Sequence, residues 1–276
     1  MTDIKIVLDS SADLIKMPGV KFGLAPLTIK TDGRRFVDDR ELELEEMVDY
    51  LYTYAGKSST ACPNPEDFAF SFCGAENVFC ITITSKLSGS YNSARIAKEM
   101  HEKKYPGCRV ELIDSLSTGP EIVLIAEKIR EMAEKDMSFD EIAENIKGYK
   151  TELVFVLESM KNLANNGRIS RVKASLASFL GIRAIGRASE EGTLEMLAKC
   201  RGQDKTVEAV IGYMREYGYA GGRVGIAHCI NASGAKALAD AIRKEFPEAS
   251  IDIRQTRGLC SFYAERGGLL IGFERE

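Results

Sequence analysis

Short apolar runs alternate with longer amphipathic segments through the first half of the chain. This alternation is typical of an α/β protein, in which helices cover the faces of a layered sheet. It predicts strands at Ile4–Leu8, Val78–Ile83 and Arg109–Ile113, and helices at about Leu42–Tyr54, Ser90–Tyr105 and Glu121–Lys135. Another helix is expected after Ser138, because Ser138 and Glu141 have the spacing of a capping box.

One segment departs from this simple alternation. Residues Phe22–Lys30 and Arg34–Val37 predict two paired strands, joined through Thr31-Asp32-Gly33. The Asp-Gly pair favours the tight turn of a hairpin. We therefore expect a β-hairpin inserted into the α/β pattern.

A second series of apolar runs begins near residue 151. It predicts strands at Glu152–Leu157, Thr193–Lys199, Arg223–His228, Ser250–Arg254 and Leu269–Phe273, with helices at Lys205–Tyr217 and Ala235–Phe246. Asp204 is the expected cap of the first of these two helices. A chain of 276 residues is long for one compact core, so we expect two closely packed α/β domains, residues 1–150 and 151–276.

The turn that follows the Val78–Ile83 strand has the layout of an anion site. A helix that starts at Ser88-Gly89 presents unpaired backbone N–H groups and the positive end of its dipole. Gly89 allows a ligand to approach the backbone, and the hydroxyls of Ser85, Ser88 and Ser90 can donate hydrogen bonds to an anionic oxygen. The alternative interpretation is that Ser88 only caps the helix.

Three other hydroxyl-rich turns could meet at the same place. Two of them, Asp9-Ser10-Ser11 and Asp114–Gly119, follow predicted strands, and ligands in open α/β sheets collect beyond the carboxyl ends of parallel strands. In the third turn, Ser58–Pro65, the prolines fix the backbone and could direct Thr60 toward the same edge. Each Asp-Ser pair could instead serve as a helix cap or an Asx turn.

Composition narrows the classes of partner. The chain is 45% apolar and 28% charged, which is ordinary for a soluble globular protein. Its formal net charge of −4, with no long Lys/Arg run, argues against nucleic acid or an anionic membrane surface. The N-terminal residues do not resemble a signal peptide, and no apolar run approaches membrane-spanning length. We expect a cytoplasmic protein that binds a small molecule or another protein.

Cysteine and histidine offer little material for a metal site or a catalytic triad. The seven cysteines contain no C-x-x-C pair and are typical of reduced thiols. Of the two histidines, His101 lies in a polar helix end and is expected to face solvent, whereas His228 follows a strand and is held in reserve as a base. We expect no metal, no cofactor and no catalytic residue.

Two enzyme or binding classes remain as alternatives. A serine-dependent acyl hydrolase would need a nucleophile and a base, but no G-x-S-x-G elbow occurs and His228 is the one plausible base. A phosphate or nucleotide binder could use the helix start at Gly89, yet neither G-x-x-x-x-G-K-[ST] nor G-x-G-x-x-G is present.

Four motifs, in order along nearly the whole chain, resemble those of the DegV family of bacterial fatty-acid-binding proteins. Asp9–Leu14 looks like the opening motif, and Thr84–Ala94 is close to the S-S-K-L-S-G-T-Y-N-S-A motif. Thr60–Phe68 is similar to the T-S-Q-P-S-P-E-D-F turn, with Ala61, Cys62 and Asn64 departing from it. Asn166–Ser170 looks like the G-G-R-I-S loop.

The resemblance implies a two-domain α/β protein that encloses one long-chain fatty acid. The carboxylate would be held at the domain junction by Thr60, Ser88 and Gly89, and the tail would be buried in the C-terminal domain. Ser10, Ser11, Ser85 and Ser115 are expected behind these contacts.

The resemblance also implies a kinase partner, which would phosphorylate the carboxylate for phospholipid synthesis. Arg168 and Arg201 then look like basic positions on the partner's side of the site. The family usually carries H-x-G-P-G before its last strand, whereas this chain places Tyr263 at the histidine position, so Tyr263 is expected to face the partner and its phosphoryl group together with the two arginines. A lipid carrier or sensor without a kinase is the alternative.

Overall fold

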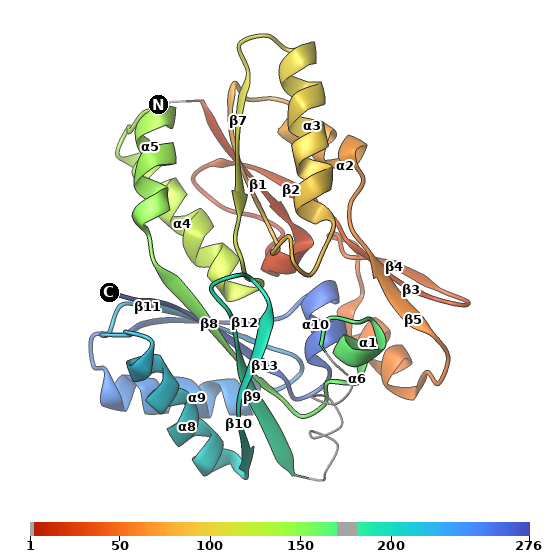
Figure 1. Cartoon of the computed structure of the whole chain (residues 1–276), viewed down its shortest axis with the longest axis vertical. Helices are drawn as coiled ribbons and strands as arrows, with labels where there is room; N and C mark the ends of the chain where they lie inside the picture. Colours follow the sequence, from red (N-terminus) through yellow and green to blue (C-terminus); the bar gives the residue numbers. More distant parts are fainter. Residues whose placement is uncertain (1–2, 170–180) are drawn as a thin grey trace.

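The computed structural model describes residues 3–169 and 181–276, which form three sheets with helices around them (Figure 1). The first sheet is fully parallel, with the strand order β2-β1-β6-β7. Its strands are β1 (Ile4–Asp9), β2 (Lys21–Ala25), β6 (Asn77–Thr82) and β7 (Arg109–Asp114). The three strands predicted for the first half are confirmed.

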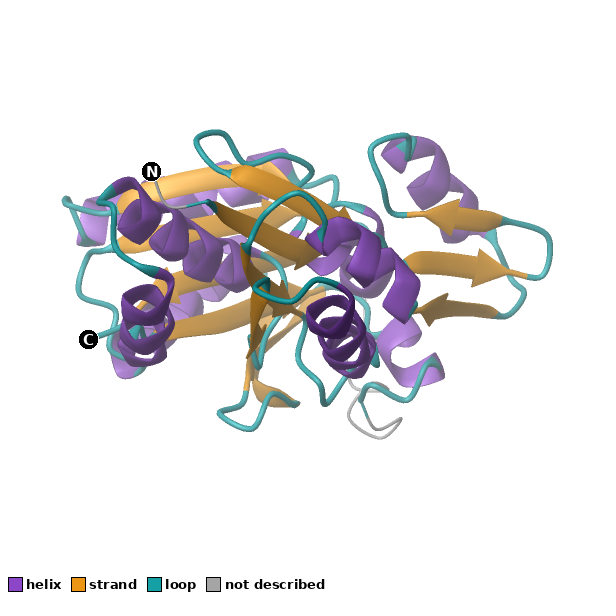
Figure 2. Cartoon of the chain, turned by 90° about the horizontal axis from the view of Figure 1, so that it is seen from above, coloured by secondary structure: helices purple, strands orange, loops and turns teal. Residues whose placement is uncertain are grey.

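Helices cover both faces of this parallel sheet, so its central strands β1 and β6 are largely apolar, whereas the edge strands carry Lys21, Arg109 and Glu111. On one face Ile6 and Phe79 pack under α4 (Pro120–Glu134) and α5 (Phe139–Asn145). On the other face Val7 and Cys80 pack under α2 (Pro65–Phe72) and α3 (Ser90–Lys104). Successive strand residues therefore contact opposite helix layers. Figure 2 shows the helices and strands of the chain from above. The capping box of Ser138 and Glu141 is present at the start of α5.

The predicted hairpin is only partly correct. Asp32-Gly33 joins β3 (Thr28–Thr31) to β4 (Arg35–Val37), which pair antiparallel. Residues 21–25, however, belong to β2 in the parallel sheet, and the chain leaves that sheet at Pro26, which has no N–H to donate. Ser58–Ala61, interpreted from sequence as a turn, is strand β5, which pairs with β3 and completes a three-stranded sheet. Helix α1 (Leu44–Thr53) lies between β4 and β5 in sequence.

The third sheet is mixed and has the strand order β10-β9-β8-β13-β11-β12. Its strands are β8 (Thr151–Leu157), β9 (Ile182–Ala188), β10 (Leu194–Arg201), β11 (Arg223–His228), β12 (Ser250–Gln255) and β13 (Leu269–Glu274). Helices α8 (Gln203–Glu216) and α9 (Ala232–Glu245) cover one face. The short helices α6 (Lys161–Asn165) and α10 (Gly258–Ala264) lie on the other. Helix α4 contacts this sheet as well as the parallel one.

The predictions for Asp204 and His101 are wrong, some elements were not predicted, and the domain division is not tested. Helix α8 starts after Gly202, so Asp204 lies within its first turn and does not cap it. His101 is buried, 4% exposed, because its ring packs against Phe72 and Tyr105. Strand β9 and the helices α2, α6 and α10 were not predicted. The division into domains at residue 150 stays a prediction.

The described helices include none long and apolar enough to span a membrane.

Candidate functional site

A cavity of about 260 Å³ lies where the six-stranded sheet meets α10 and the turn before α3. Its walls combine residues of the three-stranded and six-stranded sheets, of α6 and α10, and of the loops beside them: Leu27, Thr60, Ala61, Cys62, Ile83, Leu87, Ser88, Gly89, Thr118, Leu153, Phe155, Leu157, Leu163, Arg168, Leu194, Leu259, Cys260, Tyr263, Ala264 and Leu270. Most of these side chains are aliphatic or aromatic. Such a lining suits a largely apolar ligand that also carries a polar group.

The six-stranded sheet supplies only apolar walls. Leu153, Phe155 and Leu157 alternate along β8 and therefore point to one face, where they line the cavity. The residues between them, Val154 and Val156, point to the opposite face and pack beneath α8 and α9. The alternation of β8 thus builds a helix-covered core and a ligand cavity from one strand.

Polar groups of the cavity come from other elements. Thr60 lies on β5 and Tyr263 on α10, and their hydroxyl oxygens are 2.8 Å apart. Burial raises the pKa of Tyr263, although Thr60 and Arg168 both act against the shift. The tyrosine hydroxyl is therefore neutral at physiological pH. Since one proton joins the two oxygens, the other hydroxyl proton is free to be donated to an anionic ligand.

Ser88 and Gly89 form the start of α3, as the sequence predicts. The Ser88 hydroxyl accepts a hydrogen bond from the Ser90 N–H at 3.2 Å and lies 3.1 Å from the Ser90 hydroxyl. Ser88 therefore stabilises the first helical turn while its side chain also borders the cavity. At Gly89 an added Cβ would come within 3.0 Å of Cys62 Sγ, so the turn packs closely against the end of β5.

The two arginines expected on the partner's side occupy different places. Arg168 lines the cavity, and its guanidinium donates to the carbonyl oxygens of Leu87, at 3.1 Å, and Asn166. Gly167, with φ +72°, provides the left-handed turn that precedes it. Arg201 is exposed at the end of β10 and does not contribute to the cavity wall. Ser170, the last residue of the same motif, lies outside the described residues.

Of the four serines expected behind the contacts, Ser10 and Ser11 adjoin the cavity wall. The Ser10 hydroxyl accepts from the Leu27 N–H at 3.0 Å, and the Ser11 carbonyl accepts from Cys260 Sγ at 3.2 Å. Both serines are buried.

Ser85 and Ser115 are not beside this cavity. Ser85 is exposed, and its N–H donates to the Asp114 carboxylate. Ser115 lines a separate polar cleft near Glu121 and Glu152. The parallel strands do end at one edge of the sheet, as expected. The residues that follow them are divided between two cavities, with Ser88 in the first and Ser115 in the second.

The carboxylate of Asp9 has a structural role. It is fully buried and accepts hydrogen bonds from the backbone N–H groups of Ser11, at 3.2 Å, and Ile83, at 3.0 Å, which ties the end of β1 to the end of β6. Burial raises its pKa to about 6 despite these bonds. The Asx-turn interpretation therefore describes Asp9.

Neither histidine lines the cavity within the described residues. His228 is buried, and its Nδ1 accepts the Asn231 N–H at 3.3 Å, a contact that orders the turn after β11. A serine hydrolase at Ser88 would therefore lack a histidine base in the described part of the cavity wall. Residues 3–169 and 181–276 also contain no group of three or more His, Cys, Asp or Glu that could hold a metal ion.

Helix α10 is the part of the site that local sequence patterns missed. Its seven residues are too few to reveal a helical period, yet Leu259, Cys260, Tyr263 and Ala264 all face the cavity. The available signal was the departure at Tyr263 from the expected H-x-G-P-G segment.

Comparison with known proteins gives the family. The sequence profile described as "uncharacterised protein, DegV family" matches residues 3–276. The chain belongs to the DegV family. A DegV domain-containing protein of Streptococcus pneumoniae is 44% identical over 276 residues, which cover 98% of this chain and 98% of that protein.

Two solved structures resemble this DegV chain closely. A DegV family protein from Eubacterium eligens, loaded with heptadecanoic acid, has a TM-score of 0.97 and 40% identity, covering 99% of this chain and 100% of its own. The Streptococcus pneumoniae fatty acid kinase (Fak) B3 protein, loaded with linoleic acid, has a TM-score of 0.97 and 43% identity, with both chains fully covered. The mixed α/β fold of this chain is thus the DegV fold.

Proposed function

We propose that this DegV protein binds one long-chain fatty acid in the cavity and presents its carboxylate to a separate kinase. The observation that carries the proposal is the cavity itself, whose sheet-side wall on β8 is apolar while hydroxyls gather around Thr60, Ser88 and Tyr263. The fatty acids in the structures of two relatives at 40% and 43% identity support the same ligand class.

The apolar wall provides most of the binding free energy in this proposal. Each methylene transferred from water contributes about 0.8 kcal/mol, before the cost of ordering the chain is subtracted. The polar groups then need only orient the head. A hydrogen bond from a hydroxyl or a helix N–H to a carboxylate contributes about 1.5–3 kcal/mol.

Neutral donors suit a carboxylate that must later react. Thr60, Ser88 and the Gly89 N–H at the start of α3 can hold the oxygens without a buried ion pair. Arg168 is already engaged with two carbonyl oxygens, so its positive charge is fixed beside the head group. A carboxylate held in this way keeps its nucleophilic oxygens available to a partner.

The kinase partnership is the finer part of the proposal. It is supported by the similarity to a protein named as part of a fatty acid kinase and by the lack of a recognisable ATP-binding motif in this sequence. Arg168 and Arg201 are the proposed phosphoryl- and partner-facing residues, because a guanidinium can donate two parallel hydrogen bonds to phosphate.

Lipid analysis tests the ligand class. The protein is purified without detergent, its lipid is extracted and identified by mass spectrometry, and the delipidated protein is titrated with palmitic acid and with hexadecanol. The proposal expects a retained fatty acid and weaker binding of the alcohol, which has the same tail but no carboxylate. Equal affinity for the acid and the alcohol would contradict the carboxylate site. A protein that retains no lipid and binds no added lipid would contradict the carrier function.

The kinase part needs a reconstituted reaction with a kinase from the same genome and ATP. Acyl-phosphate formation that depends on this protein supports it. A protein that holds fatty acid but supports no phosphorylation would be a carrier or sensor without a kinase.

A further inference from the structure

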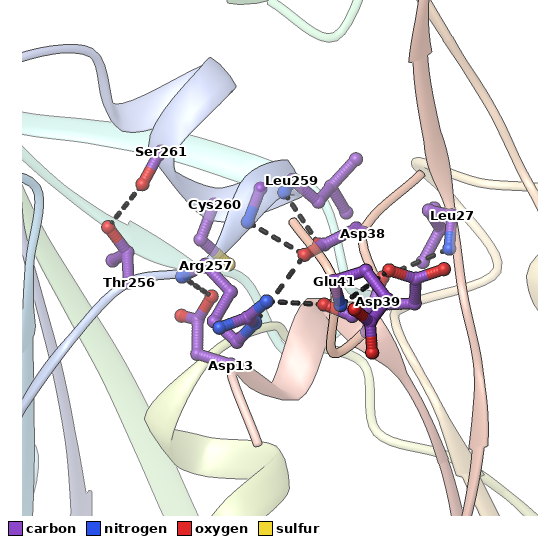
Figure 3. Close-up of polar contacts among 12 residues, drawn as sticks. Asp13, Leu27, Asp38, Asp39, Glu41, Thr256, Arg257, Leu259, Cys260 and Ser261 are labelled. Carbon is purple, nitrogen blue, oxygen red and sulfur yellow. Dashed lines mark hydrogen bonds and ion pairs between the residues drawn. The ribbon is translucent and has the colours of Figure 1, made fainter. Parts of the chain in front are cut away.

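The start of α10 is held by two buried aspartate side chains from the opposite end of the chain (Figure 3). Asp38 accepts the N–H groups of Gly258 and Leu259, each at 2.8 Å, one on each carboxylate oxygen. Asp13 accepts the preceding N–H, that of Arg257. Three consecutive backbone donors, those of Arg257 and of the first two residues of α10, are thereby bound to residues more than two hundred positions away.

The contact at Asp38 depends on a close approach of the backbone. Asp38 is fully buried, and the Arg257 Nε lies 3.8 Å from its Oδ1. A Cβ at residue 258 would come within 2.7 Å of the Asp38 Cγ, so only glycine lets the backbone approach the carboxylate this closely. Burying an unpaired carboxylate is costly, so Asp38 needs these two N–H donors. The first turn of α10 in turn needs the Asp38 oxygens as acceptors.

The three-stranded sheet connects this contact to the polar part of the cavity. Asp38 directly follows β4, and Thr60 lies on β5. Both strands pair with β3, where Ile29 is the partner of Phe36 on one side and of Thr60 on the other. The same small sheet therefore holds α10 at its first turn through Asp38 and at Tyr263 through Thr60.

We propose that Asp38 is a positioning residue that sets the Tyr263 hydroxyl against Thr60 and so shapes the carboxylate end of the cavity. Asp38 does not line the cavity and acts through α10. Loss of its two hydrogen bonds frees the first turn of α10, and Tyr263, about one turn later, loses its fixed distance from Thr60. This inference rests on the proposed fatty-acid function.

The test combines affinity with a probe of the head group. Palmitic acid labelled at its carboxyl carbon is bound to the wild type, Asp38→Ala, Asp38→Asn, Tyr263→Phe and the double variant Asp38→Ala/Tyr263→Phe. Carbon NMR then reports the carboxyl resonance, and titration gives the affinity. We expect Asp38→Ala to weaken binding about tenfold and to move the resonance in the direction that Tyr263→Phe moves it. The double variant should bind palmitic acid no more weakly than the single variants, because both changes disrupt the same contact between Tyr263 and Thr60.

Two controls separate positioning from general damage. Asp39→Ala removes the neighbouring carboxylate, which accepts the Glu41 N–H and does not touch α10 through its side chain, so it should change neither readout. Leu153→Ala, on the apolar wall, should lower affinity without moving the carboxyl resonance.

Asp38→Asn keeps the shape and one acceptor, and its effect should be smaller and of the same sign. An unmoved carboxyl resonance in the folded Asp38 variants, or additive losses in the double variant, would overturn the positioning role. So would unfolding of both Asp38 variants, since Asp38 would then be required for the fold itself. A wild type that binds no palmitic acid would instead overturn the proposed function, and this inference with it.

Discussion

Thr60 Oγ1 and Tyr263 Oη lie 2.8 Å apart, although 203 positions separate the two residues in the sequence. Thr60 belongs to a motif that resembles the family pattern, whereas Tyr263 stands where that pattern has histidine. Tyr263, the residue that departs from the family pattern, therefore lies inside the cavity beside Thr60, which is expected to hold the carboxylate. A tyrosine, whose hydroxyl stays protonated near neutral pH, can donate a hydrogen bond there but cannot supply the positive charge of a histidine.

Removing either predicted carboxylate contact should weaken fatty-acid binding. Thr60→Ala and Ser88→Ala should each cost about 1–3 kcal/mol in the free energy of binding, because each deletes a hydroxyl donor to a charged oxygen. Titration with palmitic acid measures this, and thermal unfolding checks that the fold is intact. Ser85→Ala is the matched control, since Ser85 is exposed and outside the cavity wall. Unchanged affinity in both single variants would remove this site assignment.

The two arginines should separate lipid binding from phosphorylation. Arg168→Ala and Arg201→Ala are expected to retain fatty acid and to lose acyl-phosphate formation with a cognate kinase. Since Arg168 also holds the Leu87 carbonyl, Arg168→Lys keeps a positive charge but not the planar fork and should recover little activity. The readout is acyl-phosphate formed per bound fatty acid. Normal rates in both alanine variants would contradict the assignment.

The protein without a partner should show no turnover. No histidine lines the cavity in the described residues, and the sequence has no recognisable ATP-binding motif. Incubation of the pure protein with acyl esters or ATP should therefore release nothing above the buffer rate. Steady hydrolysis that disappears in Ser88→Ala would replace the carrier with a serine hydrolase.

Asp13 should make the fold less stable as the pH rises. Burial raises its pKa from 3.8 to about 8, so the folded state keeps a proton that the unfolded chain releases. The free energy of unfolding should then fall between about pH 4 and pH 8, since the folded state binds more protons in that range. Asp13→Asn removes the titrating group, keeps an acceptor for the Arg257 N–H and tolerates the left-handed backbone at φ 58°.

Urea unfolding at a series of pH values measures this effect. Asp13→Asn should have a flatter pH profile than the wild type and a higher stability at pH 8. A slope identical to that of the wild type would contradict the prediction, because the pKa of Asp13 would then be the same in the folded and unfolded states.

Elements with a clear local signature could be predicted from the amino-acid sequence alone. Short apolar runs indicate the strands β1, β6 and β7, because helices cover both faces of the sheet and most positions on its central strands are therefore apolar. The capping box before α5 depends on residues three positions apart, and the helix start at Ser88-Gly89 on adjacent ones. The four motifs that indicate the DegV family, among them those around Thr60 and Ser88, are equally local.

The contacts that build the cavity could not be predicted in this way. The burial of His101 comes from ring packing against Phe72 on another helix, which the polar neighbours of His101 do not reveal. Ser115 follows a parallel strand as expected, yet it faces a different cleft from Ser88. Helix α10 is too short to carry a period, and its place depends on buried hydrogen bonds to Asp13 and Asp38 across more than two hundred positions. Local patterns record the neighbours of a residue along the chain, whereas the cavity is made by contacts between distant segments.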